Sequence, residues 1–162
     1  LVGRGGAADN VLTFNDCEFG GSLSYTLGGS EYDLTRIGGF LGNLERGGVF
    51  TKCSFTGSIT ADWNGGRILG AGGGNCGVGG FVGRNTGHSD NAALNIKAIF
   101  TDCVSKGTVS IKNSTDSEGA NKARLGHFIG SSNNSNATTH VETGCKYESV
   151  ITVNGKELTI EK

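Results

Sequence analysis

Residues 38–59 read GGFLGNLERGGVFTKCSFTGSI, and this stretch holds both halves of a unit that occurs four times in the chain. The first half is a short apolar segment followed by glycine, found at residues 1–3, 40–42, 81–83 and 128–130. The second half surrounds a cysteine, and the four matched cysteines are Cys17, Cys53, Cys103 and Cys145. Their spacings of 36, 50 and 42 residues indicate that inserted loops of different length separate the units.

The residues after each cysteine alternate between apolar and polar. The second residue after the cysteine is Phe19, Phe55, Ser105 or Tyr147, and the sixth is Leu23, Ile59, Val109 or Ile151. A period of two predicts half-buried strands. Each unit is too short and too polar to bury its own apolar face, so the units must stack and share one core. We therefore predict an all-β fold, a short parallel β-solenoid (β-helix) of four degenerate repeats with two or three strands each. A propeller, the rival architecture at this repeat length, needs about four strands per blade.

One solenoid domain is expected to span residues 1–162, with repeats at about 1–37, 38–78, 79–125 and 126–162. Residues 150–160 differ from the rest, because Asn154-Gly155 separates two apolar runs. This dipeptide suits the two positive-φ positions of a type I′ turn. We predict a C-terminal β-hairpin that caps the last rung and protects it from edge pairing.

Composition excludes several classes of protein. Glycine supplies 30 of 162 residues, proline is absent and the net charge is −1, which favours a turn-rich repeat over a disordered chain. Nucleic-acid binding would require a basic face, and no apolar run is long enough to span a membrane. No signal peptide is recognised, and a chain that starts at Leu1 and lacks methionine is expected to be a mature or excised piece.

The repeated unit resembles the GLUG motif, a short bacterial repeat with the pattern G-G-[LF]-[VLI]-G, then an aromatic residue, Asn/Asp-Cys and Gly-x-[VI]. The best matches are residues 38–42 with 53–59, and residues 79–83 with 103–109. The resemblance implies an extracellular β-solenoid module of the kind found in bacterial surface and secreted proteins, including adhesin-like proteins. It brings no catalytic residues, and the departures at His127 and Glu142 mark the fourth copy as terminal.

The four matched cysteines are expected to lie in one row, with neighbouring Cα atoms about 5 Å apart. Two interpretations follow: rung-to-rung disulfides in an oxidising compartment, or a row of buried thiols that act as small hydrophobes. Cys76 is the odd cysteine, and it either links two chains or stays a partly buried thiol. A zinc site is not expected, because no CxxC or clustered histidine accompanies these residues.

Outward-facing positions are also predicted to form rows. Asp16, Lys52 and Asp102 each precede a cysteine, so we expect an alternating ladder of charges that fixes the stacking order. The alternative, paired carboxylates for acid–base chemistry, is opposed by the lysine between them. A hydroxyl ladder is expected at Ser22/Ser24, Ser58/Thr60, Thr108/Ser110 and Thr152. Such a ladder is typical of any solvated strand face, and a flat Thr-rich face also binds ice.

Inserted loops at residues 61–78, 84–97 and 112–125 are the expected places for partner contact. Trp63 and Arg67 form a candidate ligand site, in which the indole would stack on a sugar ring, although an indole that anchors the loop is the plainer alternative. Sequons at Asn113, Asn133 and Asn136 are candidate glycosylation sites. His88, His127 and His140 share no motif with a nucleophile, and no metal-binding or phosphate-binding motif is present.

We therefore predict a protein without enzymatic activity and without a cofactor. The expected role is an extracellular or cell-surface structural or adhesive module that assembles end to end into a rod or filament. Its partner is then itself, or a cell-surface glycan or protein. The alternative is a carbohydrate-binding or carbohydrate-active β-helix with its site in the inserted loops, and ice binding is a more distant alternative.

Overall fold

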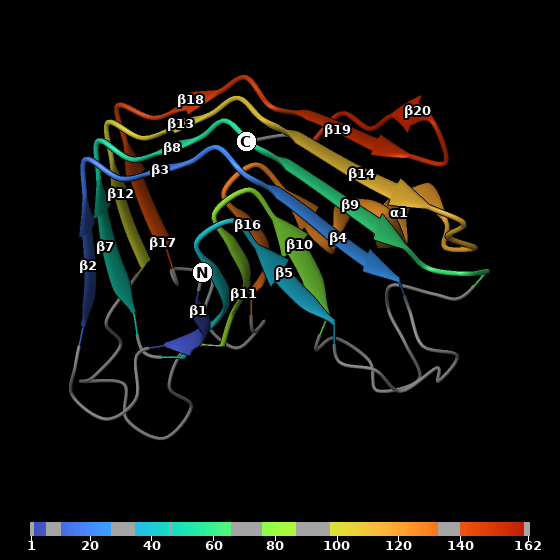
Figure 1. Ribbon diagram of the computed structural model, residues 1–162, viewed down its shortest axis with the longest axis horizontal. Helices are drawn as coiled ribbons and strands as arrows, with labels where there is room; N and C mark the ends of the chain where they lie inside the picture. The colour runs from blue at the N-terminus through green and yellow to red at the C-terminus, as the bar shows by residue number, and fades with distance from the viewer. Residues whose placement is uncertain are drawn as a thin grey trace.

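The alternating segments around each cysteine form short parallel strands in the computed structural model, and each repeat builds one rung of a stack (Figure 1). The structure describes residues 2–5, 11–26, 35–45, 47–65, 76–86, 98–132 and 140–160. Among these residues the rungs pair in parallel and in register, and the one antiparallel pair is the terminal hairpin. The predicted all-β solenoid is therefore confirmed.

Three sheets form the outer wall of the solenoid, and we name them by their places in Figure 1. The left sheet contains β2 (Leu12–Asn15), β7 (Gly48–Thr51), β12 (Ala98–Thr101) and β17 (His140–Thr143). The top sheet contains β3 (Glu18–Phe19), β8 (Ser54–Phe55), β13 (Val104–Ser105) and β18 (Lys146–Tyr147). The right sheet contains β4 (Ser22–Thr26), β9 (Ser58–Asp62), β14 (Thr108–Lys112), β19 (Val150–Val153) and β20 (Lys156–Glu157).

Two further sheets fold inward between the left and right sheets (Figure 1). The first inner sheet contains β1 (Val2–Gly5), β6 (Leu41–Leu44), β11 (Val82–Asn85) and β16 (Ile129–Ser132). The second inner sheet contains β5 (Arg36–Gly38), β10 (Gly77–Gly79) and β15 (Leu125–Gly126), and one short helix, α1 (Glu118–Lys122), precedes β15. The expectation of two or three strands per copy was too low, because corners and the inward fold divide each complete rung into five strands.

The corner between the left and top sheets is made by the residue before each cysteine. Asp16, Lys52 and Asp102 have φ angles of 51°, 52° and 53°, and Gly144 has 66° at the matching place in the fourth copy. All four lie in the left-handed region that glycine and aspartate tolerate best. No ion pair within 4.0 Å joins Asp16, Lys52 and Asp102 in the described part of the chain. The predicted charge ladder is therefore wrong, and this position serves the backbone turn.

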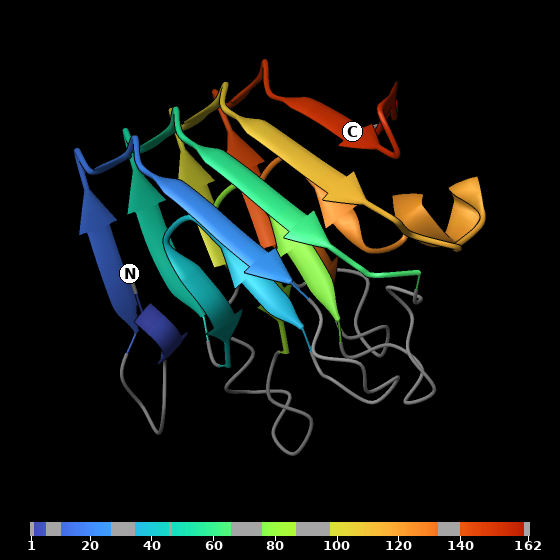
Figure 2. The same ribbon diagram turned by 45° about the vertical axis from the view of Figure 1, so that its right-hand side comes forward.

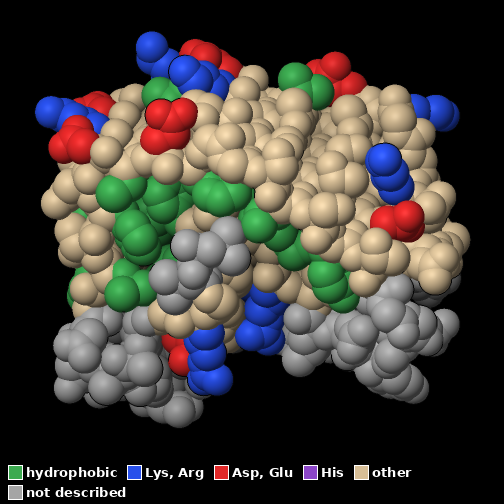
Figure 3. Space-filling model, viewed as in Figure 1, with side chains coloured by type: hydrophobic (Ala, Val, Ile, Leu, Met, Phe, Trp, Pro, Cys, Tyr) green, Lys and Arg blue, Asp and Glu red, His purple; other side chains and the backbone are tan. Residues whose placement is uncertain are grey.

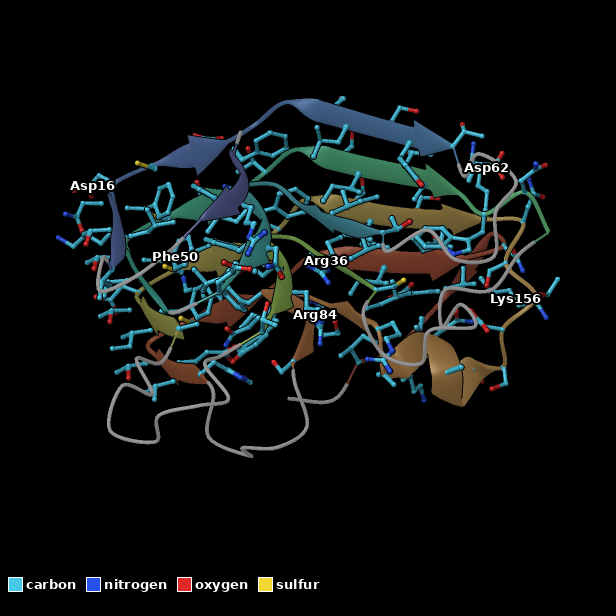
Figure 4. The ribbon with its side chains drawn as sticks, turned by 90° about the horizontal axis from the view of Figure 1, so that it is seen from below. Asp16, Arg36, Phe50, Asp62, Arg84 and Lys156 are labelled. Carbon is cyan, nitrogen blue, oxygen red and sulfur yellow. The ribbon has the colours of Figure 1, made fainter. Side chains whose placement is uncertain are left out.

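Phenylalanine side chains fill the space between the left sheet and the first inner sheet. Phe50 stacks on Phe14 and Phe100, with ring centroids 4.9 and 4.8 Å apart. A second column, Phe40–Phe81–Phe128, lies where the chain turns between the inner sheets, and Phe81 meets Phe50 edge-on at 5.9 Å. Phe50 has no exposed surface, and Figure 4 shows it inside this layer. Stacked rungs therefore build one continuous aromatic core, as the repeat predicts.

Glycines bring the two inner sheets into backbone contact with each other. A Cβ atom on Gly83 would lie 2.4 Å from the nitrogen of Ile37 and 2.6 Å from the oxygen of Gly42. A Cβ on Gly130 would lie 2.3 Å from the nitrogen of Val78. Real Cβ atoms do not approach backbone this closely, so Gly83 and Gly130, each the last glycine of its segment, are needed for the inward fold. At these two positions there is no room for a side chain between the inner sheets.

The rungs follow one another along the solenoid, with the N-terminal rung nearest the viewer in Figure 1 and the C-terminal rung behind it (Figure 2). The terminal hairpin forms as predicted: β19 and β20 are antiparallel, and Asn154 and Gly155 have φ angles of 51° and 77°. The Asn154 side chain also accepts a hydrogen bond from the Ser114 amide and donates one to the Ser114 carbonyl. This hairpin covers the outer edge of β19.

Candidate functional site

Among the described residues, the N-terminal end of the solenoid presents partly exposed apolar side chains. Strands β1 to β5 each have a neighbouring strand on one side only among the described residues. The inward-facing residues of this first rung are partly buried, whereas their counterparts in the second and third rungs are mostly buried. These residues are Leu12, Phe14, Cys17, Phe19, Leu23 and Tyr25, and we call them the N-terminal face. Figure 3 shows hydrophobic side chains gathered on this end of the molecule.

The C-terminal end has a different character, because polar side chains take core positions there. Glu142 pairs in register with Phe100, the third member of the left-sheet phenylalanine column. His140 pairs in register with Ala98, which is fully buried. The fourth rung therefore carries a carboxylate that is 18% exposed and an imidazole that is 45% exposed at positions that match Phe100 and Ala98 of the third rung. An inward-facing carboxylate of this kind protects a sheet edge from further pairing.

A pocket of about 290 Å³ opens among these residues, and we call it the terminal pocket. Its lining combines apolar side chains, both histidines of the fourth rung, one carboxylate and one ammonium group. The lining residues are Lys122, Ala123, Leu125, Gly126, His127, Phe128, Ile129, Gly130, Ser131, Ser132, His140, Glu142, Tyr147 and Ile160.

Electrostatic and aromatic contacts organise the terminal pocket. The His140 Nε2 atom lies 3.6 Å from Glu142 Oε1, and the Glu142 side chain is 18% exposed. Burial lowers the pKa of His140 below its usual value, which favours the neutral imidazole near neutral pH. The Tyr147 ring packs edge-on against Phe128 at 5.2 Å and against His127 at 5.6 Å. The Tyr147 ring therefore forms part of an aromatic wall.

A hydroxyl–imidazole network fixes His127 behind this wall. The Ser105 hydroxyl donates to the His127 carbonyl at 2.7 Å, and Ser149 Oγ lies 3.1 Å from Ser105 Oγ. His127 Nδ1 lies 2.6 Å from Ser149 Oγ. Ser105 has no exposed surface and Ser149 is 8% exposed. The network therefore holds the imidazole in place through buried hydroxyl groups.

The matched cysteines form the predicted row, but as thiols. All five cysteines of the chain are free, so the disulfide interpretation is wrong for this structure and the buried-thiol interpretation holds. Each Sγ of the later rungs faces a phenylalanine carbonyl of the preceding rung: Cys53 to Phe14 at 3.4 Å, Cys103 to Phe50 at 3.4 Å and Cys145 to Phe100 at 3.5 Å. The thiols thus help to connect successive rungs.

These thiols are expected to resist alkylation. Burial raises the pKa of Cys103 to about 11 and also raises the pKa values of Cys53 and Cys145. Only the thiolate is nucleophilic, so at pH 8 we expect Cys103 to react at least about 100-fold more slowly than in the urea-denatured chain. Iodoacetamide labelling followed by peptide mass spectrometry measures this ratio. Equal rates in the native and denatured chains would contradict a buried thiol row.

Several other predicted site residues do not form a ligand site. Trp63 is 1% exposed and packs edge-on against Tyr25 at 6.3 Å, so it anchors the loop and cannot stack on a sugar. Cys76 is 3% exposed, which excludes a link to a second chain in this conformation. Asn113 is exposed and donates a hydrogen bond to Asp62 at 2.9 Å. Arg67, His88, Asn133 and Asn136 lie outside the described residues.

The hydroxyl ladder aligns as predicted along the right sheet. Ser22, Ser58 and Thr108 are in register, and Ser58 Oγ donates to Ser22 Oγ at 2.8 Å. This row ends at Val150, which occupies the same position in the fourth rung. The second row continues in register through all four rungs, and its members are Ser24, Thr60, Ser110 and Thr152.

The described residues contain no group of three or more His, Cys, Asp or Glu side chains arranged to hold a metal ion. They also contain no helix of the length and hydropathy needed to cross a membrane.

Sequence reasoning missed the terminal pocket. The departures at His127 and Glu142 were visible, but they indicated only a degenerate last copy. One feature of the sequence could have indicated the pocket. His127 and Glu142 occupy positions where the matching residues of other copies are glycine and phenylalanine. Polar residues at core positions of the last rung indicate a cavity or a protected edge.

Comparison with known proteins identifies the repeat. The model of the GLUG motif matches residues 33–60 and 74–110. These two regions contain the inward fold and the cysteine corner of the second and third rungs. No curated protein and no solved structure matches the chain.

Proposed function

We propose that this chain, a GLUG-repeat protein, is an extracellular structural module that associates with a second copy of itself through the N-terminal face. The observation that carries this proposal is the change in burial along each apolar column. Phe55 and Ile59 are fully buried, whereas Phe19 and Leu23, their neighbours in the first rung, remain partly exposed. A partner that covers these side chains would bury them as completely as their counterparts in the later rungs are buried.

Open strand edges add a second attraction. In the described part of the chain, the outer edges of β1 to β5 have no neighbouring strand, and such edges present backbone groups that pair readily with another strand. The apolar side chains of the N-terminal face lie beside these strand edges. A partner that offers both apolar side chains and strand edges would therefore fit this end of the solenoid. A second N-terminal face has both, and two copies of one patch form a closed, two-fold interface.

The C-terminal end is a poorer partner for the N-terminal face. Strand β20 covers the edge of β19, and His140 and Glu142 occupy inward positions. Stacking an apolar face on these groups would bury charge, which costs several kcal/mol per uncompensated ion. The arrangement therefore favours pairs over the extended rod or filament that continuous head-to-tail stacking would build.

Sedimentation velocity over a range of concentrations tests the proposal, with Leu23→Lys as the variant. We expect the wild-type chain to form dimers and Leu23→Lys to raise the dissociation constant by about tenfold or more, because the two introduced lysines would be buried against an apolar surface. The matched control is Val150→Lys, which changes the same sheet at the opposite end, where Val150 is 43% exposed. Circular dichroism checks that both variants fold, and Leu23→Ser replaces the lysine variant if it does not.

Three outcomes would oppose the proposal. A wild-type chain that stays monomeric at every concentration removes the interface, and equal weakening by Val150→Lys removes its assignment to the N-terminal face. Rods that lengthen with concentration in electron micrographs would show head-to-tail stacking instead of pairs. The extracellular placement rests on the resemblance to surface and secreted GLUG proteins, and protease treatment of intact producing cells tests it separately.

A further inference from the structure

The terminal pocket lies at the opposite end of the solenoid from the proposed dimer interface. Its lining includes the apolar or aromatic side chains of Tyr147, Phe128 and Ile129 and the polar side chains of His140, Glu142 and Lys122. We propose that this pocket binds a single sugar ring, such as the end residue of a glycan. This inference does not depend on dimerisation, because the two sites share no residue.

The size of the pocket limits the ligand to one small ring. Its volume of about 290 Å³ lies just below the range for small-molecule sites, about 300 to 1,000 Å³. A single pyranose fits such a space, whereas an extended oligosaccharide would have to leave it after the first residue. The pocket therefore suits a chain end and not the middle of a polymer.

The polar groups around the pocket favour a ligand rich in hydroxyl groups. Glu142 accepts hydrogen bonds and a neutral His140 both donates and accepts, whereas the Lys122 ammonium group is paired with Glu118 at 2.8 Å. A ligand with a net negative charge would face the Glu142 carboxylate. Hydroxyl groups avoid this repulsion, because a hydroxyl donates to a carboxylate and can donate to or accept from a neutral imidazole.

An apolar wall completes the match to a sugar. Tyr147 is held by edge-on contacts with both Phe128 and His127, so its ring orientation is fixed. Aromatic rings present a broad apolar surface that packs against the C–H face of a pyranose. The Ser105–Ser149–His127 network fixes the imidazole behind Tyr147, which keeps the wall rigid before a ligand arrives. A site that is rigid in advance loses less entropy on binding.

This location differs from the loop site that the sequence predicted. Trp63 is buried in the right half of the solenoid, and the pocket that contains Glu142 and Tyr147 is formed by the fourth rung. The inward charges that limit stacking at this end would then have a second role as ligand groups.

Titration of the isotope-labelled full chain with methyl glycosides of glucose, galactose, mannose and N-acetylglucosamine, followed by NMR, tests the proposal. We expect saturable shifts of the Glu142, Tyr147 and His127 signals with at least one of these probes. Glu142→Gln keeps the shape but removes the charge, and it should weaken binding by about tenfold or more. Glu157→Gln, on the exposed strand β20, is the matched control and should bind like the wild-type chain.

Each remaining outcome contradicts a sugar site at this position. These outcomes are no saturable shift with any probe, shifts confined to residues outside the terminal pocket, and unchanged affinity in Glu142→Gln. Binding of acetate but of none of the glycosides would show an anion site instead. Lys122→Ala, in the exposed end of α1, provides a second test if Glu142→Gln does not fold. Leu23→Lys should leave glycoside binding unchanged, so failure of the dimer and failure of the sugar site are distinguishable.

Discussion

Replacing Gly83 with alanine is expected to prevent the chain from folding into this solenoid. The new Cβ atom would lie 2.4 Å from the Ile37 nitrogen and 2.6 Å from the Gly42 oxygen, and both are backbone atoms of neighbouring inner strands. Backbone cannot rotate away as a flexible side chain can, so the two inner sheets would have to separate. We expect a loss of at least about 4 kcal/mol in the free energy of unfolding, above the usual range for a single substitution. Urea unfolding followed by circular dichroism measures it.

The matched control is Gly119→Ala in helix α1, where a Cβ atom meets nothing within 4 Å. Alanine favours a helix over glycine by about 1 kcal/mol, so this variant should be as stable as the wild-type chain or slightly more stable. A Gly83→Ala chain with wild-type stability would mean that the inner sheets do not touch through their glycines. The contrast therefore tests close backbone contact and not glycine content in general.

The same glycines show why the sequence predicted the outer wall better than the inner sheets. Around Cys53, Phe55 and Ile59, alternation marks the strands directly, and these residues occupy the predicted inward positions. Strand β10 (Gly77–Gly79) contains two glycines in three residues and has no alternation to detect. Its glycines are needed because the other inner sheet approaches too closely for a side chain. This closeness depends on how the rungs stack, so the sequence of the segment alone does not reveal it.

The corner residues illustrate a second limit. Asp16, Lys52 and Asp102 occupy one row, and their alternating charges suggested an electrostatic ladder. Their common property is a positive φ angle, which the glycine at position 144 satisfies equally well. A lysine in the left-handed region is uncommon and leaves no signal in the sequence. Only the match between Lys52 and Gly144 hinted that backbone conformation governs the position.

The terminal pocket was hidden for a related reason. In the first two copies, an aromatic side chain of the top sheet packs against glycine: a Cβ on Gly39 would lie 2.9 Å from the Phe19 ring, and one on Gly80 would lie 2.8 Å from the Phe55 ring. The third copy has Ser105 in place of this aromatic residue, and the matching glycine position is His127. The two departures belong to one rearrangement, which becomes visible only when the rungs are placed in contact.

Ser149 takes part in the same rearrangement. Its position after Cys145 matches Gly107 in the third copy, where a Cβ atom would lie 2.6 Å from the Phe55 ring. Because Ser105 is small, both His127 and Ser149 have room, and the three residues form the hydrogen-bonded network behind the terminal pocket. One small side chain in the third rung thus permits two larger ones in the fourth.

Replacing Ser105 with phenylalanine is therefore expected to be strongly destabilising, although phenylalanine is the residue that the first two copies carry. Ser105 has no exposed surface, and its neighbours His127 and Ser149 fill the space that glycines leave open in earlier rungs. Overpacking and the lost hydrogen bonds together should cost about 3 kcal/mol or more in the free energy of unfolding. Thermal and urea unfolding of Ser105→Phe measure the loss.

The decisive comparison is the triple variant Ser105→Phe, His127→Gly and Ser149→Gly, which restores the packing of the earlier rungs. We expect it to recover most of the stability lost in Ser105→Phe, since the new ring would again face glycines as Phe19 and Phe55 do. Such a recovery is the non-additivity that residues in direct contact show. If the triple variant were as unstable as the sum of its parts, the three positions would be independent, and the network would have no role in shaping the fourth rung.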